Sequence, residues 1–248
     1  MASVRCLLLA SGLVTATFMP APSLAAGMNM AWTDCAALGG TPNLAFACDT
    51  NAGSHALVGT FVLPSAVDSV MGCEIVIDLV SQQATLPAWW ELFFTGACRQ
   101  PSLTIAAYDG DGATCADWAR LRASMNIADY LVSPVMTPAP NIARIKCVNA
   151  VQQVDAQSLV GDREYGGFQL EIDHQKTVGS PSCADCGNPV CLVFNSLKVV
   201  TAGNRNDVFL ASGTTAASNI ATWQGPGGNC QAVPVRRETW GRVKALYR

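Results

Sequence analysis

Cysteine content is the feature that most constrains this chain. Eleven of its 248 residues are cysteines, and ten of them lie beyond the first 25 residues. They are Cys35, Cys48, Cys73, Cys98, Cys115, Cys147, Cys183, Cys186, Cys191 and Cys230. An even number of cysteines in an exported chain is typical of a disulfide framework. We therefore expect all ten to be bonded, in up to five disulfides.

Spacing along the chain favours only a few of the about 945 ways in which ten cysteines can pair. The pairings favoured by short loops are Cys35–Cys48 and Cys98–Cys115. Cys73 and Cys147 both lie in strand-like runs, so a pair between them would cross a sheet. The remaining connectivity stays open at this level.

The first 25 residues predict export. Met1–Arg5 is short and basic, residues 6–19 are apolar, and small residues lie near Ala25. This order is typical of a secretory signal peptide, and the apolar part is shorter than the about 20 residues that span a bilayer. Cleavage after Ala25 would leave 223 of the 248 residues, with no later transmembrane segment. We expect a secreted or periplasmic protein.

Charge is sparse and unevenly distributed. Charged residues make up 13% of the chain, and the net charge is −3. The tail, Arg236–Arg248, carries five basic residues and one acid, or +4, so subtracting it and Arg5 leaves −8 for residues 26–235. An acidic body argues against nucleic acid as a partner. The basic tail is expected to dock on this body or on an anionic envelope surface.

Six segments are predicted to be strands, because β-branched and aromatic residues cluster in them between turn residues. They are Leu57–Leu63, Glu74–Val80, Leu103–Tyr108, Ile142–Val148, Phe168–Asp173 and Val190–Val200. In the second of them, Ile75, Ile77 and Leu79 alternate with other side chains. Such alternation is typical of a half-buried antiparallel strand.

Helices are predicted at two places only. Thr114 and Asp117 form a capping box, after which Trp118, Leu121 and Met125 would share a helical face. A second short helix would lie in the tail. The residues that would share its face are Trp240, Val243 and Tyr247.

The fold class that follows is mainly β. We predict an antiparallel β-sandwich with long disulfide-pinned loops and one or two short helices, and a jelly roll is one topology that fits it. Residues 26–235 would form a single domain, and 236–248 the tail. The proline-rich stretch Ser133–Asn141 is either a crossover between two sheets or a linker between two domains. One domain is the preferred interpretation.

The densest cysteine cluster, Cys183, Cys186 and Cys191, allows three interpretations. A zinc site would need further ligands, of which His174 is the nearest candidate. A redox CxxC pair would need a helix start, which Gly187 and the following proline disfavour. The preferred interpretation is a disulfide-pinned loop, with Cys230 as a distant partner of one of the three.

Two other groups are candidates for ligand binding. Asp109, Asp111 and Asp117 are spaced like the ligands of a weak calcium site, although the full calcium-loop pattern fails. An ordinary Asp-Gly turn explains the first two equally well. Trp89 and Trp90 would bind a glycan if one ring were exposed, since flat aromatic faces stack on sugars. Burial of both rings is the alternative.

Catalytic constellations are weakly represented. The chain has two histidines, His55 and His174, and no Gly-x-Ser-x-Gly motif, so a serine triad is not indicated. Paired carboxylates could still hydrolyse glycosidic bonds if they faced each other across a cleft. The candidates are Glu91, Glu164, Glu171 and Asp173.

The stretch from Thr177 to Ser196 and the ending Thr239-Trp-Gly-Arg-Val-Lys-Ala-Leu-Tyr-Arg248 are similar to a group of exported bacterial proteins with no assigned activity. The resemblance extends over most of the mature chain. It implies a bacterial, exported, single-module protein and transfers no site residues.

These observations favour a non-enzymatic module of the bacterial envelope or extracellular space, either structural or ligand-binding. An envelope polymer or a glycan would be its partner, and no cofactor is indicated apart from calcium. Two alternatives remain: a secreted carboxylate-dependent hydrolase of the glycosidase type, and a calcium-dependent adhesive or carbohydrate-binding domain.

Overall fold

The structure is a computed structural model, and it describes residues 25–93, 95–110, 115–119, 125–132, 137, 139–211, 218–225 and 230. Within these residues the strands are β1 (Gly27–Trp32), β2 (Asn43–Leu44), β3 (Ser54–Val62), β4 (Val67–Ser81), β5 (Leu103–Ala106), β6 (Met125–Val132), β7 (Ile142–Ala150), β8 (Gln157–Leu159), β9 (Glu164–Asp173), β10 (Val190–Thr201), β11 (Val208–Ala211) and β12 (Ile220–Trp223). Short 3-10 helices are η1 (Ala36–Leu38), η2 (Ala88–Trp90), η3 (Gln153–Asp155) and η4 (Ala202–Asn204).

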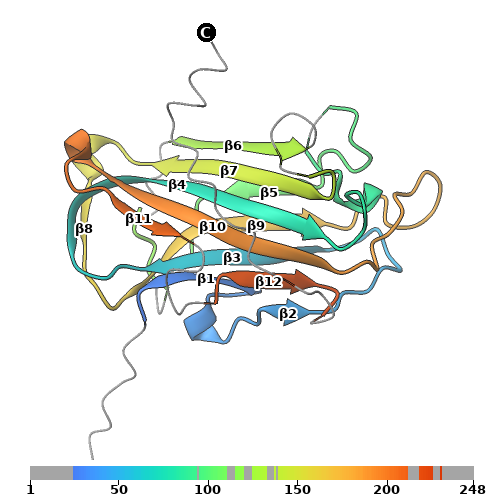
Figure 1. The fold of residues 1–248 in the computed structure, drawn as a ribbon, viewed down its shortest axis with the longest axis horizontal. Coiled ribbons are helices and arrows are strands. Elements are labelled where there is room, and N and C mark those ends of the chain that lie inside the picture. The colour runs from blue at the N-terminus through green and yellow to red at the C-terminus, as the bar shows by residue number, and fades with distance from the viewer. Residues whose placement is uncertain are drawn as a thin grey trace, which may run out of the picture.

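The strands form two sheets (Figure 1). The small sheet has the order β1-β3-β9-β5, and all its neighbours are antiparallel. The large sheet has the order β2-β12-β10-β4-β7-β6, with β11 paired to β10 and β8 paired to β4. Its pairs are antiparallel except β2 with β12. Long central strands, β4 and β10, thus position the rest of the large sheet.

The core lies between the two sheets. Phe168 of β9 and Phe194 of β10 face each other across it, with ring centroids 5.0 Å apart. The Asn149 amide of β7 donates a hydrogen bond to the Gly167 carbonyl of β9 at 2.7 Å. Two antiparallel sheets that share one apolar core are a β-sandwich, so the predicted fold class is confirmed.

The predicted strands are confirmed, and the alternation in β4 places its side chains as expected. Ile75, Ile77 and Leu79 are almost completely buried. The six predicted segments correspond to β3, β4, β5, β7, β9 and β10. The other strands were missed because most of them are short or lack clear alternation.

The helix predicted after Thr114 is wrong where the structure describes this segment, at residues 115–119 and from Met125 on. Ala116 forms an isolated bridge with Tyr165 instead, and its N–H donates to the Glu164 carbonyl at 2.9 Å. Met125, expected on the same helical face as Trp118, begins strand β6. Pairing with neighbouring strands therefore overrides the local capping signal in this segment.

The proline-rich stretch between β6 and β7 joins two strands that pair directly in the large sheet. Residues 1–24, which include most of the predicted signal peptide, and the basic tail 236–248 with its predicted helix lie outside the described residues. In the part of the chain that the structure describes, no helix has the length and apolar character needed to cross a membrane.

Candidate functional site

Four disulfides join eight of the ten cysteines that were predicted to be bonded. They are Cys35–Cys115, Cys48–Cys186, Cys98–Cys183 and Cys191–Cys230. Both pairings predicted from short loops are therefore wrong. The partners lie 80, 138, 85 and 39 residues apart in sequence, because the completed fold rather than loop length brings the sulfurs together.

The expected fifth disulfide does not form, because Cys73 and Cys147 are free and buried. Cys73 lies opposite Asn149 in the β4–β7 pair, and Cys147 lies opposite Ile75. The two thiols are thus diagonal neighbours rather than direct partners. Burial raises the pKa of Cys147 to about 12, and burial followed by the nearby Cys147 raises the pKa of Cys73.

The cysteine cluster at 183–191 is a disulfide-pinned loop, as preferred from the sequence. Each of its three sulfurs is bonded, and the partner of Cys191 is Cys230. Bonded sulfur offers no thiolate for zinc or for disulfide exchange. Within the described residues, no three histidine, cysteine or acidic side chains gather as a metal site would require.

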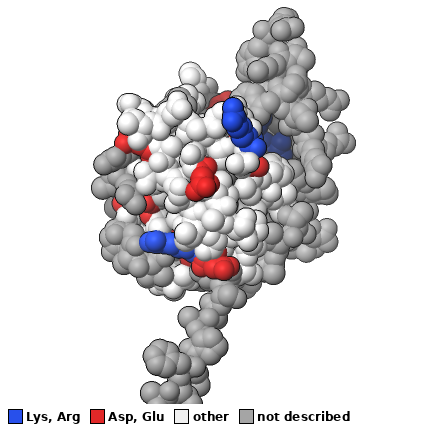
Figure 2. All heavy atoms as spheres, turned by 90° about the vertical axis from the view of Figure 1, so that its left-hand side faces the viewer, with Lys and Arg blue, Asp and Glu red and all other residues white. Residues whose placement is uncertain are grey.

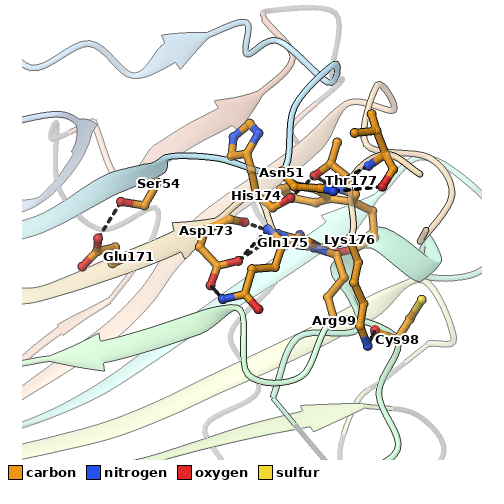
Figure 3. Close-up of polar contacts among 12 residues, drawn as sticks. Asn51, Ser54, Cys98, Arg99, Glu171, Asp173, His174, Gln175, Lys176 and Thr177 are labelled. Carbon is orange, nitrogen blue, oxygen red and sulfur yellow. Dashed lines mark hydrogen bonds and ion pairs between the residues drawn. The ribbon is translucent and has the colours of Figure 1, made fainter. Parts of the chain in front are cut away.

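Two of these disulfides connect three loops at one end of the sandwich, on the right of Figure 1. We call this region the loop end and define it as residues 45–53, 87–102 and 174–189. It contains a polar cluster centred on the buried Arg99 (Figure 3). Figure 3 shows Arg99 extending toward the stretch from Asp173 to Thr177.

Each of the three Arg99 guanidinium nitrogens donates a hydrogen bond within the fold. The guanidinium donates to the carbonyl of Gln175 at 2.9 Å, to that of Trp89 at 2.8 Å, and to that of Asp173. It also lies 3.8 Å from the Asp173 carboxylate and 3.5 Å from the centre of the Trp89 ring. Burial lowers the pKa of Arg99 to about 10, against the opposing effect of Asp173. Arg99 thus connects its own loop, residues 87–102, to the stretch from Asp173 to Gln175.

Both predicted glycan-stacking rings, Trp89 and Trp90, are fully buried, which corrects that prediction. Their rings contact each other and Trp223, whose centroid lies 4.7 Å from that of Trp89. The Trp89 indole donates to Thr177 Oγ1 at 3.1 Å, and the Trp223 indole to the Cys186 carbonyl at 2.8 Å. Because η2 turns both neighbouring rings inward, neither presents a flat face to solvent.

The predicted calcium ligands are only partly described. Asp109 is exposed and Asp117 is half-buried, whereas Asp111 lies outside the described residues. The calcium site therefore stays a prediction.

The four candidate carboxylates have different environments. Glu164 is buried, where it accepts hydrogen bonds from Thr60 and Asn29. Glu91 accepts the Cys98 N–H at 3.4 Å. Glu171 and Asp173 lie on one face of β9, and Figure 3 shows them directed toward Ser54 and Gln175. Only this last pair shares a face that is open to solvent.

A shallow groove of about 470 Å³ lies at the edge of the sandwich, between β5 and β6. Its lining residues are Phe93, Leu103, Thr104, Ile105, Asn126, Ile127 and Ala128. The Asn126 amide bridges the two sheets by donating to the Ile105 carbonyl at 2.8 Å. Ile127 is 60% exposed. Sequence reasoning missed this groove because it took the region before β6 for a helix.

Charged side chains are scattered over another face of the molecule (Figure 2). Figure 2 shows only a few scattered charged side chains on the side of the molecule where β8 and β11 lie. Exposed apolar residues of these segments include Val160, just after β8, and Phe209 in β11. Scattered apolar side chains are ordinary on a protein surface, so this face does not by itself indicate a site.

Together, the fold and the loop end define a disulfide-linked antiparallel β-sandwich. No family model matches the chain, and no curated protein matches its sequence. One similar solved structure is the second type II cohesin module from the cellulosomal adaptor ScaA scaffoldin of Acetivibrio cellulolyticus, at 8% identity and a TM-score of 0.33. The match covers 74% of this chain and 89% of the cohesin chain. A likeness at this level carries no argument about function.

Proposed function

We propose that this chain is an exported, non-enzymatic module of the bacterial envelope or extracellular space that binds a ligand or supports a structure. One observation carries the proposal: the polar groups around Arg99 are engaged in contacts within the fold. Each Arg99 guanidinium nitrogen donates to a backbone carbonyl, and the cysteines around it are bonded. Four disulfides fit an oxidising compartment outside the cytoplasm.

The β5–β6 groove is the place at which we propose ligand binding. It combines apolar side chains with two polar ones, Thr104 and Asn126, as small-ligand sites usually do. Its volume lies within the about 300–1,000 Å³ typical of such sites. The proposed ligand class is a glycan or another envelope polymer, since an exported protein meets these first.

The test compares two exposed apolar residues of similar exposure. Ile127 lines the groove and is 60% exposed, whereas Val160 lies outside it and is 54% exposed. Processed protein, Ile127→Asp and Val160→Asp are applied to a glycan array and to purified cell-wall polymer. We expect binding to fall at least about tenfold for Ile127→Asp only, because a bound ligand would remove the new carboxylate from water at a cost in free energy. Equal binding by all three would overturn the assignment of the groove, and no binding by the parent would leave only a structural role.

Export is tested separately by the mass of the protein recovered from outside the cytoplasm. We expect an N-terminus at Ala26, after loss of residues 1–25. Recovery inside the cell with these residues attached would contradict the proposal.

A carboxylate-dependent hydrolase is the second candidate, favoured by the shared face of Glu171 and Asp173. Two residues along a strand are about 7 Å apart, and the carboxyl groups of glycosidases are about 5–10 Å apart. Hydrolysis of a polysaccharide that is abolished by Glu171→Gln would establish this candidate. Absence of turnover by the parent protein on wall and plant polysaccharides would exclude it for these substrates.

A further inference from the structure

The two histidines of the chain meet at the loop end. His55 lies at the start of β3 and His174 directly follows β9, and their ring centroids are 4.8 Å apart. Aromatic rings surround the pair: Phe46 lies 4.0 Å from His55, and Trp223 lies 5.8 Å and 6.0 Å from the two imidazoles. Two residues 119 positions apart in sequence are thus brought into one apolar cluster.

The environment of His174 suits a neutral ring and opposes a charged one. The residue is 2% exposed, and neither Nδ1 nor Nε2 has a partner in full hydrogen-bond geometry, although the Thr50 backbone lies near enough to act on the pKa of the ring. A protonated imidazole has two N–H donors, and burying both without acceptors costs more than burying a neutral ring. His55 is half-buried, and its charge would lie beside that of His174.

The charged groups around the pair come from two segments of the loop end and from the last residue of β9. The cation is Arg99, from the loop after η2, and it lowers the pKa of His174 in addition to the larger effect of burial. Asp173, Asp49 and the Thr50 backbone act in the opposite direction, but the net shift is downward. The pKa of His55 is also lowered, first by burial and then by His174.

We propose that His55 and His174 form an acid-sensitive latch that closes the loop end when both rings are neutral and releases its loops when they are protonated. The release is local, because Cys48–Cys186 and Cys98–Cys183 keep the three loops connected. Opening would expose the buried Trp89 and Trp223 rings to solvent. Acid would therefore uncover an aromatic surface without unfolding the sandwich.

The direction of the pH effect follows from proton linkage. The open loops bind protons with the ordinary histidine pKa of about 6.5, whereas the closed loops bind them more weakly. The closed state is therefore most stable, relative to the open state, above pH 6.5. Its stability decreases as the pH falls below this value. Each histidine multiplies the opening equilibrium constant by up to about tenfold per pH unit.

Amide hydrogen exchange tests the latch in the processed protein. Between pH 7.5 and 5.5, corrected for intrinsic rates, we expect exchange in the loop end to accelerate at least about tenfold. Amides of the β4–β7 pair provide the internal control and should not respond. Since the chain has only two histidines, NMR titration of their imidazole protons should give two folded-state pKa values below 6.5.

The double variant His55→Phe, His174→Phe removes the titration and keeps aromatic rings in the cluster. We expect its loop-end exchange to be independent of pH over the same range, with tryptophan fluorescence confirming a closed cluster at both pH values. If this variant fails to fold, the NMR titration and the hydrogen exchange of the parent together decide the matter. The proposal is overturned by imidazole pKa values at or above 6.5, by pH-independent exchange in the parent, or by an unchanged acid response in a folded variant.

Discussion

The loop end and the β4–β7 strand pair contain cysteines in opposite chemical states. In the strand pair, nine consecutive residues of each strand are in register, and Cys73 and Cys147 are free thiols within it. At the loop end, the backbone is irregular, and four cysteines form two disulfides that connect distant segments. The free thiols pack as small apolar side chains, whereas the disulfides hold together segments that are not joined by strand pairing.

The comparison shows what stabilises each region. A hydrogen-bonded ladder and a buried face already fix the position of Cys73 and Cys147, so a cross-link would add little. Loops that lack a ladder must satisfy their carbonyl groups and restrict their motion by other means. Arg99 donates hydrogen bonds to the carbonyl groups, and the disulfides restrict the motion of the loops. Substitutions in the two regions should therefore lower the free energy of unfolding by different amounts.

The largest effect is expected for Arg99→Ala. The change removes the donors of three buried or half-buried carbonyl groups and leaves a void beside Trp89. We expect the free energy of unfolding to fall by about 3–5 kcal/mol. Denaturant unfolding of the oxidised protein measures it. Arg163→Ala is the control, because Arg163 is exposed and lies 5.8 Å from the Tyr165 ring centre, and it should cost under about 1 kcal/mol. Equal costs for the two would remove the special role of Arg99.

The second effect is expected for the double variant Cys98→Ser, Cys183→Ser. This disulfide closes a segment of 85 residues, so its loss should cost about 2–4 kcal/mol of unfolding free energy. Hydrogen exchange should rise at the loop end and stay unchanged in β4 and β7. A uniform rise in exchange throughout the sandwich would show that the two regions are not energetically distinct.

The same contrast explains how much of the molecule could be predicted from its sequence. Strands such as β4 and β9 were predicted because alternation along a strand is a local signal. The Cys48–Cys186 pair and the Arg99 contacts could not be predicted, because they join segments that only the completed fold brings together. The disulfide-pinned loop at Cys183 followed from the spacing of its cysteines, whereas export stays a prediction.

Two errors at candidate sites have a similar origin. Trp89 and Trp90 were candidates for stacking on sugars, but residue type alone does not show whether a ring faces outward. The helix predicted after Thr114 had a valid local signal, and pairing of Ala116 with Tyr165 outweighed it. No sequence signal indicated the meeting of His55 and His174, since the pairing of β3 with the end of β9 brings them together.

The smallest effect is expected in the strand pair itself. Cys73→Ala and Cys147→Ala each remove one buried sulfur, and we expect each to cost about 1 kcal/mol of unfolding free energy, since the ladder remains intact.

A thiol reagent provides the sharper measurement of the strand pair. At pH 8, a thiol with the pKa of about 12 of Cys147 is ionised in roughly one molecule in ten thousand, and burial also blocks access. The processed, folded protein should therefore react with no equivalents of reagent, and the unfolded, unreduced protein with two. Reaction with none after unfolding would mean that a fifth disulfide links β4 to β7, and rapid reaction of two before unfolding would mean that the strand pair opens as readily as the loops.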